Sequence, residues 1–483
     1  MMNKKLNKNV IYSLLKSFSQ MIFPMITFPY ISRVLQAENV GKINFSNSIV
    51  GYVSLLASLG LTTYAVRECS KVKNNRERLS QLSSELISIN LITTLIAYGG
   101  LLIILICFKP LNNYRFLIMI LSMSVFFTTL GADWLNTAME DFGYITIRVF
   151  IFQLFSIISM ILFVKTPSDY YKYAIITVIS TSGANIMNIL YRKKYCEVKF
   201  TFKIDWKRHI KPIITLFALI LSQNIFLNSD ITILGLLRGD FEVGLYSTSV
   251  KIYNLINTMI ASIAWVVMPQ MSFLFEQKNY DEINKLFKFS ANFIFILGIP
   301  CVVGLNLYSS EIIQVIAGNS FANANVSLKI LSFALLVSLI AGLLGNIILL
   351  PEGKDNICLK ACSISAVFNI ISNLILIPLM GLNAAAMTTL FSQLIVLIIY
   401  YINMNPKIYL ENKKEIILQP IIASSSIILL KYVINCFYQF SILVFLISIC
   451  LTVIIYFSIL ILLNNTFIMS YFKSLVRKGE HKK

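Results

Sequence analysis

Apolar runs of about 20 residues recur along the whole chain, and each is long enough to cross the ~30 Å hydrocarbon core of a bilayer as an α-helix. We place fourteen such spans, near residues 10–31, 43–65, 82–107, 116–138, 146–164, 173–191, 212–236, 244–270, 289–308, 328–350, 361–379, 384–404, 416–435 and 441–463. Transmembrane β-strands are about half this length and alternate in polarity, which excludes a barrel. The sequence therefore predicts an all-α membrane protein with about 14 transmembrane helices.

The composition agrees with a chain that is surrounded mostly by lipid. Hydrophobic residues make up 57% of the 483 residues and charged residues only 13%, whereas soluble domains are about 25% charged. A charge that faces hydrocarbon is costly, so low charge is expected of a surface exposed to lipid. The basic start of the chain precedes an apolar run without a small-residue cleavage site, and we therefore expect no cleavable signal peptide.

The basic residues are distributed unevenly between the two sides of the membrane. The chain carries 41 Lys and Arg against 22 Asp and Glu, a formal charge of +19. With the N-terminus in the cytoplasm, 30 of the 41 fall in cytoplasmic segments, 9 in outer loops or outer helix ends, and 2 inside spans. This is the positive-inside pattern. It favours a multi-pass protein with both termini in the cytoplasm, and it explains the basic charge without nucleic acid as a partner.

The chain contains two halves that resemble each other at a constant offset of 203 residues. Ser19-Gln20-x-Ile22-Phe23 matches Ser222-Gln223-x-Ile225-Phe226, and Val40-Gly41 matches Val243-Gly244. Because both halves begin on the same side, they are expected to be parallel repeats. We predict five parts: a six-helix lobe (1–191), a basic cytoplasmic linker (192–211), a second six-helix lobe (212–404), the additional helices 13 and 14 (405–463), and a basic cytoplasmic tail (464–483).

Polar residues inside four of the spans recur at spacings of three and four, which places them on one helical face. They include Lys16 and Gln20 in the first span, Asn44 in the second, Gln223 and Asp230 in the seventh, and Lys251 and Asn254 in the eighth. Such stripes either bond to one another between helices or face a wet cavity. We favour the cavity for the ionisable Lys16, Asp230 and Lys251. The alternative is that Asp230 only neutralises Lys251.

The sequence lacks the patterns that accompany catalysis, nucleotide hydrolysis or metal binding. It has no Gly-x-x-x-x-Gly-Lys-Ser/Thr loop, its eight Cys show no zinc-type spacing, and its two His lie in basic segments. The longest outer segment, near 309–327, is too short to hold a sugar-polymerising site. We therefore expect a protein that is not an enzyme and that needs no cofactor or metal.

Four passages resemble the Wzx-type polysaccharide and O-antigen flippases of the multidrug/oligosaccharidyl-lipid/polysaccharide exporter superfamily. They are Gly60-Leu61-Thr62-Thr63-Tyr64-Ala65-Val66-Arg67-Glu68, Asp133-Trp134-Leu135-Asn136-x-x-x-Glu140-Asp141-Phe142-x-Tyr144-Ile145-x-x-Arg148, Lys165-Thr166-Pro167-Ser168-Asp169-Tyr170, and Asp230-Ile231-x-Ile233-Leu234-Gly235 with Val243-Gly244-Leu245-Tyr246. In the second passage Asp133, Trp134 and Glu140 match the family signature. Asn136 departs from it, because it stands where an aromatic residue is expected.

The resemblance implies a two-lobed helical bundle that works by alternating access in the bacterial inner membrane. Its substrate would be a polyprenyl-pyrophosphate-linked oligosaccharide, such as an O-antigen (lipopolysaccharide) or capsular repeat unit. Membrane lipids, a polymerase and a chain-length regulator would be its partners.

Several side chains are candidates for this transport. Lys16, Lys251, Arg67 and Arg148 would attract the pyrophosphate, while amides such as Gln20, Asn44, Gln223 and Asn254 would replace water around the sugar hydroxyls. Asp230 is the candidate for ion coupling. Two alternatives stay open: an ion-coupled drug or cation exporter of the same superfamily and, less favoured, a membrane sugar polymerase or ligase.

Overall fold

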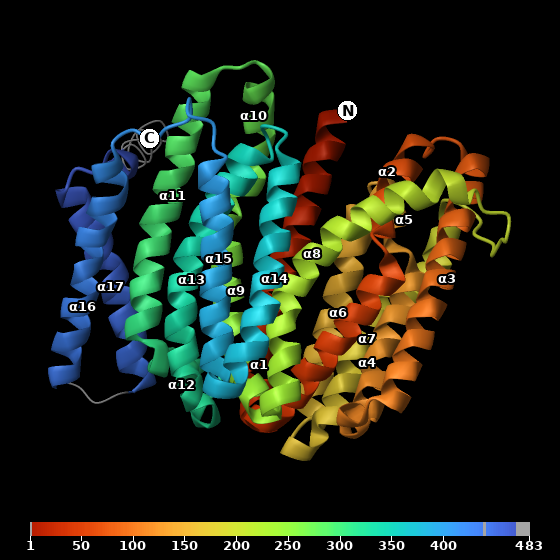
Figure 1. Ribbon diagram of the computed structural model, residues 1–483, viewed down its shortest axis with the longest axis horizontal. Helices are drawn as coiled ribbons and strands as arrows, with labels where there is room; N and C mark the ends of the chain where they lie inside the picture. The colour runs from red at the N-terminus through yellow and green to blue at the C-terminus, as the bar shows by residue number, and fades with distance from the viewer. Residues whose placement is uncertain (1, 438–440, 470–483) are drawn as a thin grey trace. The chain divides into compact units, whose positions relative to one another are not determined.

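The computed structural model places residues 2–437 and 441–469, and it positions their side chains except at 2–11, 13, 14, 215, 218, 219, 222–227 and 437. Within these ranges the chain forms helices and loops without strands (Figure 1). It divides into two compact units, Met1–Ser247 and Thr248–Lys483. The predicted all-α class is confirmed.

The first unit holds the elements up to the start of α9. They are α1 (Met2–Ser58), α2 (Leu61–Lys71), α3 (Arg76–Cys107), η1 (Lys109–Tyr114), α4 (Arg115–Gly131), α5 (Asp133–Ala138), α6 (Phe142–Phe163), η2 (Pro167–Asp169), α7 (Tyr170–Tyr191), η3 (Arg192–Lys194), α8 (Trp206–Arg238) and α9 (Asp240–Ala261). Figure 1 shows α8 running from the end of this unit that carries α2 to the opposite end.

The second unit contains the rest of α9 and the remaining elements. They are α10 (Ile263–Glu276), α11 (Tyr280–Leu307), α12 (Ser309–Ile316), η4 (Asn319–Ala324), α13 (Asn325–Leu344), η5 (Gly345–Leu349), α14 (Asp355–Met380), α15 (Leu382–Ile402), η6 (Lys414–Leu418), α16 (Gln419–Phe437) and α17 (Ile442–Leu462). An apolar cavity of about 300 Å³ lies in this unit, with Pro300, Ile427 and Phe445 among its lining residues. The described residues that line it carry no charge, so it suits hydrocarbon better than a charged headgroup.

Twelve segments of the described chain are long and apolar enough to cross a membrane, against the fourteen predicted spans. The difference has two sources. The segment Leu15–Lys71 is counted once, although it contains two predicted spans joined through a kink at Gln36. The predicted span 212–236 lies within α8, which is 33 residues long but is not among the twelve. The fold is that of an all-α membrane protein with 12 to 14 crossing helices.

The sequence repeat reappears as two matching turns in the first unit. Gln36 breaks α1 with φ 66° and ψ 170°, and Gly239, 203 positions later, separates α8 from α9 with φ 87° and ψ −177°. Farther along, the Asn44 side-chain nitrogen donates to the Ser247 hydroxyl at 2.7 Å, and these two residues are also 203 positions apart. Equivalent residues of the two repeats therefore share a backbone conformation and contact each other.

Two glycines allow the helices after these turns to cross closely. A Cβ at Gly41 would lie 1.8 Å from the carbonyl oxygen of Asp240, and a Cβ at Gly244 would lie 1.9 Å from the carbonyl oxygen of Ala37. Glycine is required at both positions because no side chain fits against backbone at that distance. This crossing ties the start of α9 to α1, which explains why the first unit extends to Ser247 and not to the linker at 192–211. The predicted six-helix lobes remain a prediction.

Candidate functional site

The predicted polar stripe of the first span includes an accessible part of α1. Lys16 is partly exposed and Gln20 is exposed. Between them, Ser19 is buried and donates to the Gln153 side-chain oxygen on α6 at 2.7 Å. Ser19 therefore serves helix packing, while the charge of Lys16 and the amide of Gln20 remain open to a ligand.

The polar stripe of the second span serves mainly to join helices. Asn44 bonds to Ser247, as described above. Thr232 on α8 donates to the Ser48 hydroxyl at 2.9 Å and lies 3.2 Å from the Tyr52 hydroxyl. Of the two roles that the sequence left open for this stripe, hydrogen bonding between helices is the one that these contacts support.

Asp230, the candidate for ion coupling, is buried on α8. One of its carboxylate oxygens accepts a hydrogen bond from the Tyr246 hydroxyl at 2.7 Å. Sequence reasoning missed this partner, because a tyrosine 16 positions away cannot be matched to a carboxylate by helical spacing. The side chain of Gln223, predicted on the same span, lies outside the described residues.

In the second unit, α9 presents a polar face. Lys251, Asn254 and Thr258 are all exposed, and their spacing places them on one side of the helix. Thr258 bonds to the Asn254 carbonyl at 2.7 Å, while the Asn254 amide faces outward with Lys251. This stripe has the same character as the accessible part of α1: one amine and one amide within a turn of each other.

The signature residues Asp133 and Arg148 form an ion pair at the junction of α5 and α6. One terminal guanidinium nitrogen of Arg148 donates to both carboxylate oxygens, at 2.6 and 2.7 Å. Arg148 is only 1% exposed, whereas Asp133 is 40% exposed. The guanidinium also lies over the Tyr144 ring, 5.2 Å from its centre. Arg148 therefore has its counter-charge within the protein, and its predicted contact with the pyrophosphate stays a prediction.

Asn136, the departure from the signature, has a structural role. Its side-chain nitrogen donates to the Asn188 oxygen on α7 at 2.6 Å, and Asn188 donates in turn to the Gly131 carbonyl at 2.7 Å. Both amides are fully buried. Ala132, between α4 and α5, adopts a left-handed conformation at φ 51°. The amide pair therefore satisfies backbone that this break leaves without a helical partner.

The remaining signature residues fall into the core and onto the surface. Trp134 is buried in an apolar cluster with Leu61 and Leu135. Glu140 is exposed and pairs with Lys73 at 2.6 Å. Arg67 on α2 is 57% exposed and lies 3.2 Å from Glu68. Of the two predicted arginines, only Arg67 presents its charge to solvent.

Asp141, in the turn before α6, is surrounded by tyrosines. It accepts hydrogen bonds from the Tyr195 hydroxyl at 2.5 Å, the Tyr191 hydroxyl at 2.8 Å and the Tyr144 backbone N–H at 3.3 Å. Burial by itself would raise the pKa of Asp141, but these bonds and the nearby Lys194 hold the pKa below its usual value. The carboxylate is thus stabilised in its charged form and fixes the ends of α6 and α7.

Comparison with known proteins identifies the family. The model of a family described as polysaccharide biosynthesis protein matches residues 6–275, more than half of the chain. The chain belongs to this family.

Two relatives align over most of their length. A protein of Shigella dysenteriae, provisionally named an O-antigen transporter, is 20% identical over 81% of this chain and 98% of its own. The capsular polysaccharide biosynthesis protein CapF of Staphylococcus aureus is 25% identical over 82% of this chain and 98% of its own length.

Solved structures share the fold. The lipid II flippase MurJ, in an inward closed conformation, superposes with a TM-score of 0.76 at 16% identity, covering 97% of this chain and all of its own. An outward-facing multidrug MATE transporter superposes with a TM-score of 0.56 at 13% identity, covering 83% of this chain and 94% of its own. At these identities the likeness concerns the fold alone.

Proposed function

We propose that this polysaccharide biosynthesis protein is a flippase, and that it moves a polyprenyl-pyrophosphate-linked oligosaccharide across the bacterial inner membrane by alternating access. Both termini lie in the cytoplasm in this proposal. Two relatives support it, one named for O-antigen transport and one for capsule biosynthesis, which this chain matches over 81% and 82% of its length.

The observation that carries the proposal is the chemistry of the exposed polar faces. Lys16 with Gln20, and Lys251 with Asn254, each combine an amine and an amide inside a predicted span. An amine suits an anionic pyrophosphate, and an amide can replace the water that sugar hydroxyls lose. Arg67 adds a further exposed cation. Arg148 acts in this proposal as a positioning residue, which holds Asp133 in place.

The driving force fits the net charge of the substrate. With the cytoplasm negative, a potential of 100 mV favours outward movement of each negative charge by ~2.3 kcal/mol. A pyrophosphate headgroup therefore moves outward down the field. Asp230, whose carboxylate is held by Tyr246, is the group that would bind a counter-transported proton or cation.

A drug or cation exporter is the second candidate, since MATE transporters share the fold. The exposed polar faces argue against it, because Lys16 and Lys251 would repel an organic cation. The MATE superposition is also looser than that with MurJ, at a TM-score of 0.56 against 0.76.

The test is translocation by the purified protein in sealed vesicles. A fluorescent polyprenyl-pyrophosphate oligosaccharide is placed in both leaflets, and its exposure to a membrane-impermeant glycosidase is followed. We expect protein-dependent exchange without ATP, accelerated by an imposed potential that drives anions toward the glycosidase. A polyprenyl chain without sugar and an organic cation serve as control cargoes. Strict dependence on ATP, or transport of the cation alone, would refute the proposal.

A further inference from the structure

The segment that links α7 to α8 is fastened to α3 by a regular set of hydrogen bonds. Residues 196–201 run without helical structure along the first turns of α3. The backbone N–H groups of Glu197, Lys199 and Thr201 donate to the hydroxyls of Ser80, Ser84 and Ser88, at 3.1, 3.0 and 2.9 Å. Each serine also donates to the carbonyl four residues earlier on α3, at 2.7 Å. We call this arrangement the serine ladder.

The serine ladder is possible because four residues of helix and two residues of extended chain rise by nearly the same distance. Four residues of α-helix rise ~6.0 Å, and two residues of extended chain rise ~6.6 Å. Every second backbone N–H of the extended segment can therefore hydrogen-bond to every fourth side chain of the helix, here three times in succession. The serine hydroxyls provide acceptors for backbone groups that have no strand partner.

A second contact fastens the end of the segment. His209, in the first turns of α8, is fully buried. One ring nitrogen lies 2.8 Å from the Tyr64 hydroxyl and the other lies 3.1 Å from the Glu85 carboxylate. The chain between the ladder and His209 is thus held at both ends against the first unit, and the side chains of residues 199–208 have defined positions.

The length of α3 sets the depth of this segment. The helix has 32 residues and so spans ~48 Å, while the hydrocarbon core is ~30 Å thick. Counted back from Cys107, the outer end of the predicted span 82–107, ~30 Å of helix reaches Ser88, which places Ser88 at the boundary between hydrocarbon and headgroups. Thr201, which is bonded to Ser88, lies at the same depth. The predicted orientation places this boundary on the cytoplasmic side.

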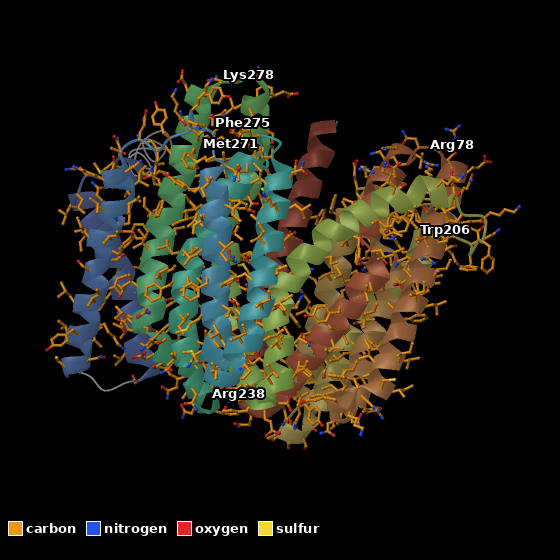
Figure 2. The ribbon with its side chains drawn as sticks, in the orientation of Figure 1. Arg78, Trp206, Arg238, Met271, Phe275 and Lys278 are labelled. Carbon is orange, nitrogen blue, oxygen red and sulfur yellow. The ribbon has the colours of Figure 1, made fainter. Side chains whose placement is uncertain are left out.

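The side chains at that depth are aromatic and basic. Phe200 is 51% exposed, Phe202 is 83% exposed, and their rings meet edge to face at 4.8 Å. Trp206, labelled in Figure 2 at the same end of the first unit as Arg78, is 40% exposed. Around them Lys199, Lys203, Lys207 and Arg208 are exposed. The whole linker 192–211 holds eight Lys and Arg against two Asp and Glu.

We propose that this segment is a lipid-binding surface: Phe200 and Phe202 insert into the boundary of the cytoplasmic leaflet, and the surrounding lysines bind anionic phospholipid headgroups. Aromatic rings are favourable at this depth, and each basic residue near an anionic surface strengthens binding by about 5-fold. A soluble protein partner would also suit exposed aromatics, but the hydrogen-bonded depth of Thr201 favours lipid. Phe200, Phe202 and the surrounding lysines are not among the residues proposed for the oligosaccharide.

The depth can be measured with a tryptophan at the tip of the segment. The full-length variants F202W/W206F and W206F are reconstituted into vesicles, and the difference between their emissions reports position 202. We expect this emission to be quenched more by lipids with a nitroxide at carbon 5 than at carbon 12. Quenching by aqueous iodide without quenching by lipid would overturn the proposal and point to a soluble partner.

The role of the lysines can be tested by the preference of the protein for anionic over neutral phospholipids. Association of spin-labelled phosphatidylglycerol is compared with that of phosphatidylcholine in wild type, K199Q/K203Q and K413Q/K414Q. The last variant removes the same charge from two exposed residues at the start of η6. We expect K199Q/K203Q to lose preference for phosphatidylglycerol, by about 5-fold per lysine at most, and the control to keep it. Equal preference in all three would refute the proposal. Both tests are independent of whether the protein translocates an oligosaccharide.

Discussion

The charged residues at the junction of α5 and α6 differ from those on α1 and α9 in their burial and pairing. At the junction of α5 and α6, Arg148 is 1% exposed and bound to Asp133. On α1 and α9, Lys16 is partly exposed and Lys251 is exposed. The first arrangement uses its charge to hold the fold, and the second places its amines where solvent reaches them. The comparison teaches that a family signature can contain structural groups, while the lysines proposed to bind the substrate lie outside that signature.

The largest expected effect comes from removing the partner of Arg148. Asp133→Ala leaves a buried guanidinium without its counter-charge, which costs up to about 3–5 kcal/mol of folding free energy. We expect strong loss of folded protein, measured as thermal unfolding in detergent and as monodisperse yield. If this variant unfolds like wild type, the ion pair does not stabilise the fold, and the distinction between structural and accessible charges is wrong.

Glu140→Ala is the matched control for Asp133→Ala, since both remove a signature carboxylate. Glu140 and its partner Lys73 are 47% and 37% exposed, so solvent screens the pair and its loss should cost only ~0–1 kcal/mol. A near-wild-type melting temperature is expected. Equal damage from both substitutions would mean that exposure does not separate the two signature carboxylates.

The next effect concerns transport and not stability. Lys16→Ala and Lys251→Ala should each weaken the pyrophosphate contact by about 1–3 kcal/mol, or ~5- to 150-fold in translocation rate. Lys→Arg should retain part of the rate, because the charge stays. Vesicle assays measure the rate, and unfolding in detergent should be unchanged. Lys285→Ala removes a lysine that is 72% exposed and paired with Glu282, and it should transport normally. Wild-type rates in both Lys→Ala variants would exclude a binding role.

The smallest effect is a pH dependence at Asp141. Because the hydrogen bonds lower its folded pKa below the unfolded value of about 3.9, its stabilising contribution is complete at neutral pH. It is lost only as pH falls below about 4, through the folded pKa. We expect the melting temperature to fall less steeply below pH 4 in Asp141→Asn than in wild type. Tyr195→Phe should shift the wild-type fall to higher pH. Identical acid profiles would contradict this assignment.

Much of the fold followed from local sequence patterns. The apolar runs predicted the helices, and the turns that the structure shows at Gln36 and Gly239 lie at the same offset of 203 residues as the sequence matches. Less of the candidate site could be predicted. Helical spacing grouped Asn44 with Lys16 as polar stripe residues, yet Asn44 bonds to Ser247 and Lys16 is accessible. Spacing reports which side of a helix a residue occupies, but it does not report what lies opposite that side.

The sequence by itself determined that this chain crosses a membrane many times, because hydropathy acts on each segment separately through the lipid that surrounds it. It also determined the family, through the residues of the signature. Only the tertiary structure decided which charges are available. Arg148 is neutralised by Asp133, 15 positions away, and the linker is held against α3 by Ser80, Ser84 and Ser88, more than 100 positions earlier. The physical reason is that burial and pairing depend on neighbours in space, and packing brings those neighbours together from distant parts of the chain.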